Sequence, residues 1–299
     1  MSAKSIALIG VGGIGTHILR AFTNLSNGPK IVVFTRSESK EKPLLPDDLA
    51  SVPVVPVDYA DVSALTGVLK AHAVDVIIST VPMPAGEKAQ YALADAAKAA
   101  GSVKLFAPSE WGIPTEGAKE RGEVSWFAVK DEFVEYLKSI EMPYTRFYIG
   151  FGMSYVPWLT GMDVTDSVHV VGTGEELLTL TSETDAGGFT AHVLTNYSLT
   201  SPKLVNQSLR LKGQTVTLRE AAQIYSKPVV FIPEGGQIPA RSERELYLKT
   251  VLQTEAAGGR LNTGWDRRTW TYDPELEGSA NKLWDGHVWE TLESTIGQT

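Results

Sequence analysis

The sequence contains no cysteine in its 299 residues, which excludes disulfides, thiol catalysis and thiolate metal sites. Positive charge is also scarce, because 27 lysines and arginines stand against 35 aspartates and glutamates. The resulting net charge of −8 disfavours nucleic-acid binding through phosphate neutralisation. No apolar run approaches the roughly 18 residues that a membrane span needs, and the opening MSAKS carries no signal-peptide pattern. We therefore expect a soluble, cytoplasmic protein that binds neither nucleic acid nor membrane.

Two familiar kinds of catalytic motif are missing as well. The histidines show neither HExxH spacing nor a histidine–carboxylate pair; they are His17, His72, His169, His192 and His287. There is no GxSxG segment, the turn that presents the nucleophile of many serine hydrolases. The sequence therefore predicts neither a metal site nor a serine hydrolase.

What the sequence does contain, near its start, is a glycine-rich turn. Apolar residues 6–9 lead into GVGGIG at residues 10–15, and a helical pattern follows. This is the strand–turn–helix context of the dinucleotide fingerprint, in which the glycines allow a tight turn, close approach of a pyrophosphate and close helix–strand packing. The helix N-terminus would then hold the anion. We expect the dinucleotide to contact Gly10, Gly12, Gly13, Ile14 and Gly15.

The first half of the chain alternates strand-like and helix-like segments. Strands are expected at residues 5–9, 30–35, 52–56, 74–79, 103–108 and 144–149, and helices at 15–25, 62–71, 85–100 and 127–139. Strands separated by helices of this length indicate βαβ units and a parallel sheet. The sequence therefore predicts an α/β fold, with a Rossmann-type, doubly wound parallel sheet over residues 1–153 that binds the dinucleotide.

The alternation breaks after about residue 152. Helices are expected near residues 189–199, 217–225, 244–255 and 282–296, with a strand near 208–211. Thr217 and Glu220 have the spacing of a helix capping box. Residues 154–299 are therefore predicted to form a smaller, mixed α/β substrate-binding lobe, partly interleaved with the first part.

The end of the second expected strand bears on which dinucleotide is bound. NAD-type sites place an acidic residue there for the ribose hydroxyls, whereas this chain has Arg36 between Thr35 and Ser37. A guanidinium with adjacent hydroxyls can bind a 2′-phosphate, and Lys40 and Lys42 add positive charge. NADP(H) is therefore favoured over NAD(H). The expected cofactor site also includes Thr80, Val81 and Pro82. Asp58 has two open interpretations, adenine contact and an ordinary turn.

The candidate chemistry lies in residues 125–139, SWFAVKDEFVEYLKS. A helix here would place one stripe of residues together, namely Trp126, Val129, Lys130, Phe133, Val134 and Leu137, with Asp131, Glu132 and Glu135 largely opposite. Burial disfavours the charged form of a lysine, so its pKa would fall toward a range useful for proton transfer. The alternative is a lysine that extends from the edge of the stripe to solvent, and the spacing does not decide between the two.

Several motifs together resemble the NmrA-like, isoflavone-reductase-like branch of the atypical short-chain dehydrogenases/reductases. They are GVGGIG, Arg36, FAPSEWG at residues 106–112, and the Lys130 helix followed by PYTRFYIGFG. The resemblance extends loosely through TDAGGF to TVTLREAAQI (residues 215–224). It implies that Lys130 is the family's catalytic or cofactor-holding lysine. Ser109 is expected at the cofactor, with loop capping left open, and Glu110 is either a proton-relay partner or a structural salt bridge.

One departure from ordinary short-chain dehydrogenases matters for the chemistry. They use Tyr-x-x-x-Lys, but the residue four before Lys130 is Trp126, whose indole does not titrate in this range. The isoflavone-reductase branch also lacks that tyrosine. The resemblance therefore implies an NADPH-dependent reductase that delivers hydride to a conjugated or benzylic carbon of a small aromatic, phenylpropanoid or lignin-derived substrate. Lys130 would act as general base or proton relay. The alternative is a non-catalytic NADP(H)-binding redox sensor of NmrA type.

Aromatic residues at strand ends and at the start of the second lobe are the expected substrate contacts: Trp111, Phe151, Tyr155 and Trp158. Phe147, inside a strand, is expected in the core. Tyr148 and Tyr155 remain further candidates for the proton donor. The oligomeric state is not determined by the sequence, and a homodimer is left open.

Overall fold

The chain divides into two compact units, each assembled from separate stretches of sequence. The computed structural model describes residues 1–36, 45–82, 86–233 and 236–297. The first unit comprises Met1–Trp111, Thr115–Phe147 and Ala186–Leu209. The second comprises Gly112–Pro114, Tyr148–Asp185 and Arg210–Thr299. Residues 112–114 therefore belong to the second unit although the residues on both sides of them belong to the first, and residues 186–209 belong to the first unit although their neighbours belong to the second.

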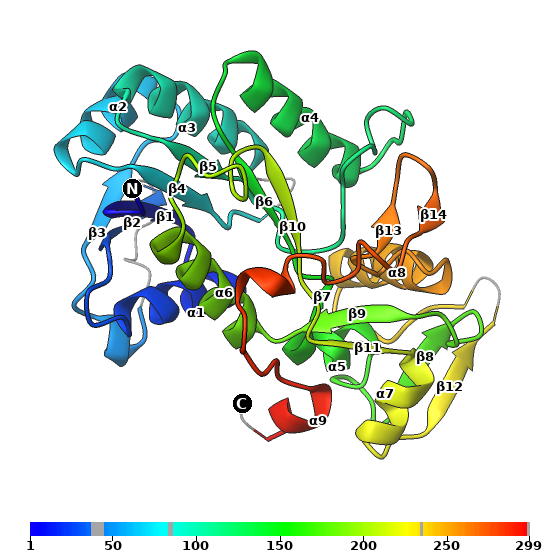
Figure 1. Ribbon diagram of the computed structural model, residues 1–299. Helices are drawn as coiled ribbons and strands as arrows, with labels where there is room; N and C mark the ends of the chain where they lie inside the picture. The colour runs from blue at the N-terminus through cyan, green and yellow to red at the C-terminus, as the bar shows by residue number, and fades with distance from the viewer. Residues whose placement is uncertain (37–44, 83–85, 234–235, 298–299) are drawn as a thin grey trace. The chain divides into compact units, whose positions relative to one another are not determined.

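A parallel sheet forms the centre of the first unit, as predicted (Figure 1). Its strands are β1 (Ser5–Ile9), β2 (Lys30–Arg36), β3 (Val54–Val57), β4 (Val76–Ser79) and β5 (Leu105–Ala107), in the order β3-β2-β1-β4-β5. Ile6 pairs with Ile31 on one side and with Val76 on the other. The chain therefore changes direction across the sheet between β1 and β4. In doubly wound sheets, ligands bind beyond the carboxyl ends of the strands at this point.

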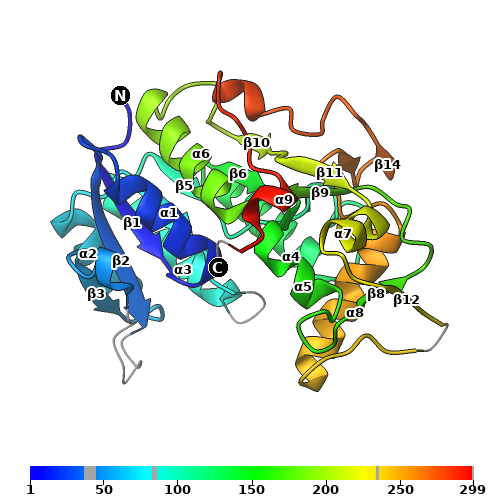
Figure 2. The same cartoon turned by 90° about the horizontal axis from the view of Figure 1, so that it is seen from below.

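Helices cover both faces of this sheet, which explains why β1 is buried along its whole length. On one face lie α2 (Val62–Ala71), α3 (Glu87–Ala100) and α4 (Trp126–Ser139), whose apolar residues join those of the strands in one core cluster (Figure 1). On the other lie α1 (Gly13–Thr23) and α6 (Glu183–Asn196), which are side by side in Figure 2. A side chain at Gly187 of α6 would come within 2.6 Å of the His17 carbonyl oxygen, so only glycine allows this approach.

The strand predicted at residues 144–149 is β6 (Thr145–Tyr148), which pairs with β10 (Gln207–Arg210). Its link to the parallel sheet is one isolated bridge, between Phe106 of β5 and Tyr144. The short β5 ends at Ala107, one residue before a proline, which leaves little strand for β6 to pair with.

The second unit contains short strands that the sequence pattern did not reveal. One sheet joins β7 (Phe151–Gly152), β9 (Leu178–Thr181) and β11 (Gln214–Val216). Another pairs β8 (Val168–Val171) with β12 (Val229–Ile232), and a third pairs β13 (Trp265–Asp266) with β14 (Thr271–Tyr272). The helices of this unit are α5 (Val156–Leu159), α7 (Leu218–Ile224), α8 (Glu243–Ala257) and α9 (Leu292–Thr295), and 3-10 turns occur at Met153–Tyr155 and Asn281–Leu283. The first unit has a 3-10 turn at Asp47–Leu49.

Two helix predictions in this part of the chain have definite outcomes. The capping box is confirmed: Thr217 Oγ1 accepts from the Glu220 N–H at 3.0 Å, and the Glu220 carboxylate accepts from the Thr217 N–H at 2.7 Å. The helix predicted over residues 282–296 is wrong, because only Asn281–Leu283 and α9 are helical there. Gly286 between them has φ +75°, in the left-handed region, which interrupts a right-handed helix.

Of the helices in the described ranges, none has both the length and the apolar character needed to cross a bilayer. Within the same ranges, no group of three or more histidine, aspartate or glutamate side chains is placed to hold a metal ion.

Candidate functional site

The glycine turn has the geometry of a phosphate cradle. Gly10 has φ +92°, a conformation that other residues rarely adopt, and a Cβ on Gly15 would lie 2.4 Å from the Gly10 carbonyl oxygen. Gly12 differs, since a Cβ there would meet nothing within 4 Å. Gly12 is also the N-cap of α1, and it provides no side chain to satisfy the first N–H groups of the helix. Gly13 is exposed and Ile14 is half-buried. An anion could therefore reach these N–H groups.

Thr80, predicted to contact the cofactor, holds this turn together. Its hydroxyl donates to the Gly10 carbonyl at 2.8 Å and lies 3.1 Å from the Ile9 carbonyl. Its backbone N–H donates to Ile9 as well, at 2.8 Å. The end of β4 is thereby bonded to the turn that follows β1, across the point where the chain changes direction.

Ser109 and Val81, also predicted at the cofactor, are joined to each other. The Ser109 hydroxyl donates to the Val81 carbonyl at 2.8 Å, and the Ser109 N–H donates to Gln90 Oε1 at 2.8 Å. These bonds give Ser109 the loop-capping contacts that the sequence left open. Pro82, next in the chain, is exposed.

Arg36 ends β2 with its side chain exposed, and Thr35 before it is half-buried. The positive charge of Arg36 acts on Tyr59, whose pKa is raised by burial and drawn down by the guanidinium. Asp58 Oδ1 accepts from the Ala60 N–H at 2.8 Å, so this carboxylate forms a turn of its own. Ser37, Lys40 and Lys42 lie outside the described residues.

Lys130 occupies an enclosed position on α4, whose first turn is capped by Ser125. Only 17% of its side chain is exposed, and Nζ donates to the Glu110 carbonyl oxygen at 2.8 Å. The same Nζ lies 4.0 Å from Glu110 Oε2. Loss of hydration lowers the pKa of Lys130, and the Glu110 carboxylate only partly opposes this effect. Trp126 packs edge-on against Phe127, with ring centroids 5.4 Å apart.

Glu110 belongs to a buried set of charges that the sequence did not predict. Its two carboxylate oxygens each lie 3.0 Å from the Thr115 hydroxyl, and Oε1 lies 3.5 Å from Nε of the buried Arg146. Arg146 Nη2 in turn donates to Asp131 Oδ1 at 2.7 Å. The prediction that Asp131 lies largely opposite the apolar stripe is wrong, because it is 5% exposed and also accepts from the Gly117 N–H. An arginine in the strand-like segment TRFY was the signal for a buried counter-ion.

Trp111 lies in the first unit, where its indole makes one hydrogen bond and one stacking contact. Its Nε1–H donates to the Ser79 carbonyl at 2.7 Å, and its ring stacks on Phe147 with centroids 5.0 Å apart. Its φ of +38° is unusual for a bulky residue. Phe147 is fully buried, as predicted.

The other predicted aromatic residues belong to the second unit. Tyr155 is 43% exposed, and its ring meets that of the half-buried Phe151 edge-on. Burial, and secondarily the charge of Glu183, raise the pKa of Tyr155. Trp158 on α5 lies 5.5 Å beneath the ammonium of the buried Lys249. Tyr148 is fully buried, with the Arg210 guanidinium 5.8 Å from its ring centroid.

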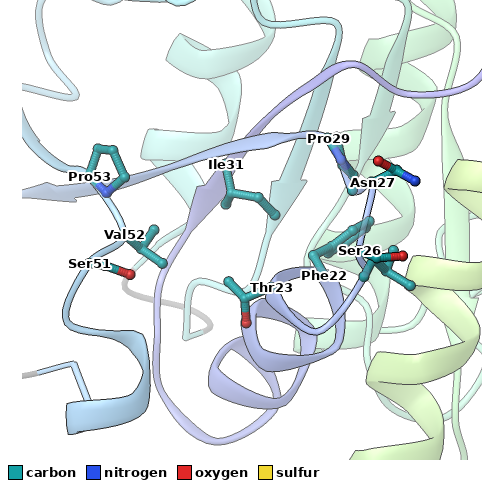
Figure 3. A pocket seen from close by; sticks show the side chains of 11 residues that line it. Phe22, Thr23, Ser26, Asn27, Pro29, Ile31, Ser51, Val52 and Pro53 are labelled. Carbon is teal, nitrogen blue, oxygen red and sulfur yellow. The ribbon is translucent and has the colours of Figure 1, made fainter.

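A separate pocket of the first unit lies at the far end of α1 from the glycine turn (Figure 3). Phe22 and Thr23 at the end of α1 face Ile31 at the start of β2, with Val52 and Pro53 completing the wall. Because β2 begins here, the pocket is at the amino edge of the sheet, away from the predicted cofactor edge. None of its described lining residues is ionisable. It therefore offers no groups for proton transfer.

Several known proteins that are named as reductases are similar to the chain. The chain is 29% identical to phenylcoumaran benzylic ether reductase PT1 of Pinus taeda, over 85% of this chain and 82% of that one. It is 28% identical to eugenol synthase 1 of Petunia hybrida, over 99% of each. The fold is similar to that of the leucoanthocyanidin reductase–NADPH complex from Vitis vinifera, with a TM-score of 0.78, 18% identity and 98% of each chain covered.

A solved isoflavone reductase is similar as well, with a TM-score of 0.75, 20% identity and 99% of each chain covered. At identities of 18% and 20%, the structural similarity shows a shared fold. The family comes from the sequence itself, because the model of the NmrA-like family matches residues 2–242. The chain therefore belongs to the NmrA-like family, as its motifs indicated.

Proposed function

We propose that this chain is an NADPH-dependent oxidoreductase that reduces a small aromatic substrate of phenylpropanoid or lignin-derived type. The observation that carries the proposal is Lys130, an amine in an enclosed site with a lowered pKa. The relatives support the reaction class, because they are named as a benzylic ether reductase and a eugenol synthase. We assign cofactor binding to residues 1–153, and substrate binding to residues 154–299 together with Trp111 and Phe151.

The residues of the glycine turn fit a dinucleotide. Gly12 leaves open space above an uncapped helix N-terminus, and the bonds from Thr80 hold the turn in shape. Arg36 lies exposed at the carboxyl end of β2, and its guanidinium would bind the 2′-phosphate of NADP. The proposed contacts are Gly10, Gly12, Gly13, Ile14, Gly15, Thr35, Arg36, Ser37, Thr80, Val81, Pro82, Ser109 and Lys130. When bound, NADPH supplies the hydride.

Lys130 supplies proton transfer in this proposal. The Glu110 carbonyl accepts one N–H of the amine and so orients Nζ, while desolvation favours the neutral form. A neutral amine has a lone pair that accepts a proton from a phenolic hydroxyl, or passes one on as a relay. Trp126 cannot take this role, because its indole N–H only donates. Binding of the nicotinamide ribose hydroxyls by Lys130 is compatible with either role.

Aromatic side chains are proposed to contact the substrate: Trp111, Phe151, Tyr155 and Trp158. Trp111 is already immobilised by Ser79 and Phe147, so it would present a rigid surface to a flat ring. Tyr155 is the most exposed of these four side chains. Its hydroxyl stays protonated because its pKa is raised.

The test is NADPH oxidation with a panel of conjugated phenolic aldehydes, enones and benzylic ethers. We expect turnover of at least one compound, and a loss of about 100-fold or more in kcat for Lys130→Ala. Lys98→Ala is the matched control, since this exposed lysine of α3 pairs with Glu141 on the surface. Equal activity of Lys130→Ala and the wild type would remove Lys130 from the mechanism.

The second candidate is a non-catalytic NADP(H) sensor, favoured by one observation: Trp126 stands where short-chain dehydrogenases carry their proton-donating tyrosine. A sensor would bind NADPH through the same turn and leave every compound of the panel unchanged. Tight binding without turnover would therefore support the sensor over the reductase.

A further inference from the structure

Four charged side chains of alternating sign lie in contact inside the first unit. Lys130 Nζ is 4.0 Å from Glu110, Glu110 is 3.5 Å from Arg146, and Arg146 is 2.7 Å from Asp131. Side-chain exposure is 17% for Lys130, and 1%, 2% and 8% for the others. The four come from α4, from the segment after β5 and from β6. Lys130 is therefore the most exposed of the four side chains.

The members of this cluster differ in whether their charge can change. The guanidinium of Arg146 stays protonated under all conditions that a folded protein tolerates. Asp131 accepts from the N–H groups of Gly117 and Lys119, at 3.0 and 3.2 Å, in addition to its bond with Arg146. Glu110 accepts from the Thr115 hydroxyl and faces the cations of Lys130 and Arg146. Lys130 lies at the end of this row of charges, and burial lowers the pKa of its amine.

The negative charge of Glu110 favours the protonated form of Lys130, and a cation beside Glu110 offsets part of that effect. An isolated carboxylate in this enclosed position would hold Lys130 protonated, and so unable to accept a proton. A permanent positive charge on the other side of that carboxylate weakens its hold. The charge of Arg146 acts to lower the pKa values of Lys138 and Tyr144. The charge that acts on the pKa of Lys130 is that of Glu110, which acts to raise it.

We propose that Arg146 is a positioning residue that holds and partly neutralises Glu110, and thereby keeps Lys130 able to lose its proton. This inference rests on the proposed function, because it explains how that function's proton-transfer group is prepared. Arg146 touches neither substrate nor cofactor in this role. It acts only through Glu110, with Asp131 holding its other end.

The test measures the protonation of the Lys130 amine directly, by NMR on the full-length protein. Lysine amines are labelled by reductive ¹³C-methylation, the Lys130 resonance is assigned with Lys130→Arg, and its chemical shift is followed against pH. We expect Arg146→Gln to raise the midpoint by about one pH unit, and Glu110→Gln to lower it. Arg146→Lys, which keeps the charge, should stay closer to the wild type. Arg20→Gln is the matched control, because Arg20 pairs with Asp48 at the surface.

Opposite shifts of the two glutamine variants distinguish this role from a structural one, since loosened packing would move both midpoints toward that of a solvated lysine. An unchanged midpoint in Arg146→Gln, or shifts of the same sign, would overturn the proposal. If Arg146→Gln does not fold, Arg146→Lys and Glu110→Gln decide, and equal midpoints for these two overturn it. The titration needs neither substrate nor cofactor, so it stands even if no panel compound is reduced. If one is reduced, the acidic limb of kcat/KM should move with the midpoint.

Discussion

The Thr80 hydroxyl donates a hydrogen bond to the Gly10 carbonyl oxygen at 2.8 Å, and so ties the end of β4 to the turn after β1. This bond spans the place where the strand order changes direction, together with the bonds from Thr80 to the Ile9 carbonyl. The same turn brings the Gly15 Cα so close to the Gly10 carbonyl that no side chain fits. Both contacts serve to hold the backbone N–H groups at the start of α1 in one arrangement.

Thr80→Val should weaken NADPH binding about five- to tenfold, because one hydrogen bond to the turn contributes roughly 1 kcal/mol. Cofactor fluorescence titration measures the effect. Thr23→Val provides the control, since that hydroxyl also bonds to a backbone carbonyl, but at the other end of α1. Unchanged affinity in Thr80→Val would mean that the turn keeps its shape without the bond.

Two glycine substitutions should separate folding from binding. Gly15→Ala places a Cβ 2.4 Å from a backbone oxygen, so we expect a clear fall in Tm. Gly12→Ala meets no atom within 4 Å, so Tm should stay close to that of the wild type. Its methyl group would occupy the space of the pyrophosphate, and NADPH affinity should fall. Thermal melts with and without NADPH measure both; normal affinity in Gly12→Ala would contradict the cradle.

Arg36→Ala should weaken NADPH binding roughly 10- to 100-fold, because a charge-assisted bond to the 2′-phosphate contributes about 1.5–3 kcal/mol. NADH, which lacks that phosphate, should lose little. Competition titrations with the two reduced cofactors measure the ratio. An equal loss for both would show that Arg36 acts on some other part of the nucleotide.

The lowered pKa of Lys130 also predicts a pH dependence of stability. Between the folded pKa and the ordinary value of 10.5, the unfolded state binds more protons at this site than the folded state does. Stability contributed by this residue therefore rises with pH across that window and is lost as pH falls through the folded pKa. The wild type should gain unfolding free energy relative to Lys130→Met between pH 7 and pH 10, measured by urea denaturation.

A difference that stays constant over the same pH range would show that folding leaves the proton affinity of Lys130 unchanged. Lys98→Met is the control, because it removes the same charge from an exposed position on α3.

The structure reproduces most closely the predictions that rest on local patterns in the sequence. β1 runs from Ser5 to Ile9 and α2 from Val62 to Ala71, at the residues that the apolar pattern indicated. The same pattern failed at residues 282–296. There the apolar residues stack on one another, with Trp284 and His287 parallel at 3.5 Å, and Gly286 turns the chain between them. A periodic set of apolar residues does not reveal which partner each one will find.

The sequence by itself determined the parallel α/β fold, the family and the glycine turn, because each depends on residues that are neighbours along the chain. The tertiary structure alone decided what surrounds Lys130. Glu110, Arg146 and Asp131 come from segments whose spacing in the sequence carries no periodic signal, and Asp131 was predicted to lie largely opposite the apolar stripe. Charges in a poorly hydrated interior are tolerated only with partners, and those partners meet only when the strands and helices have packed.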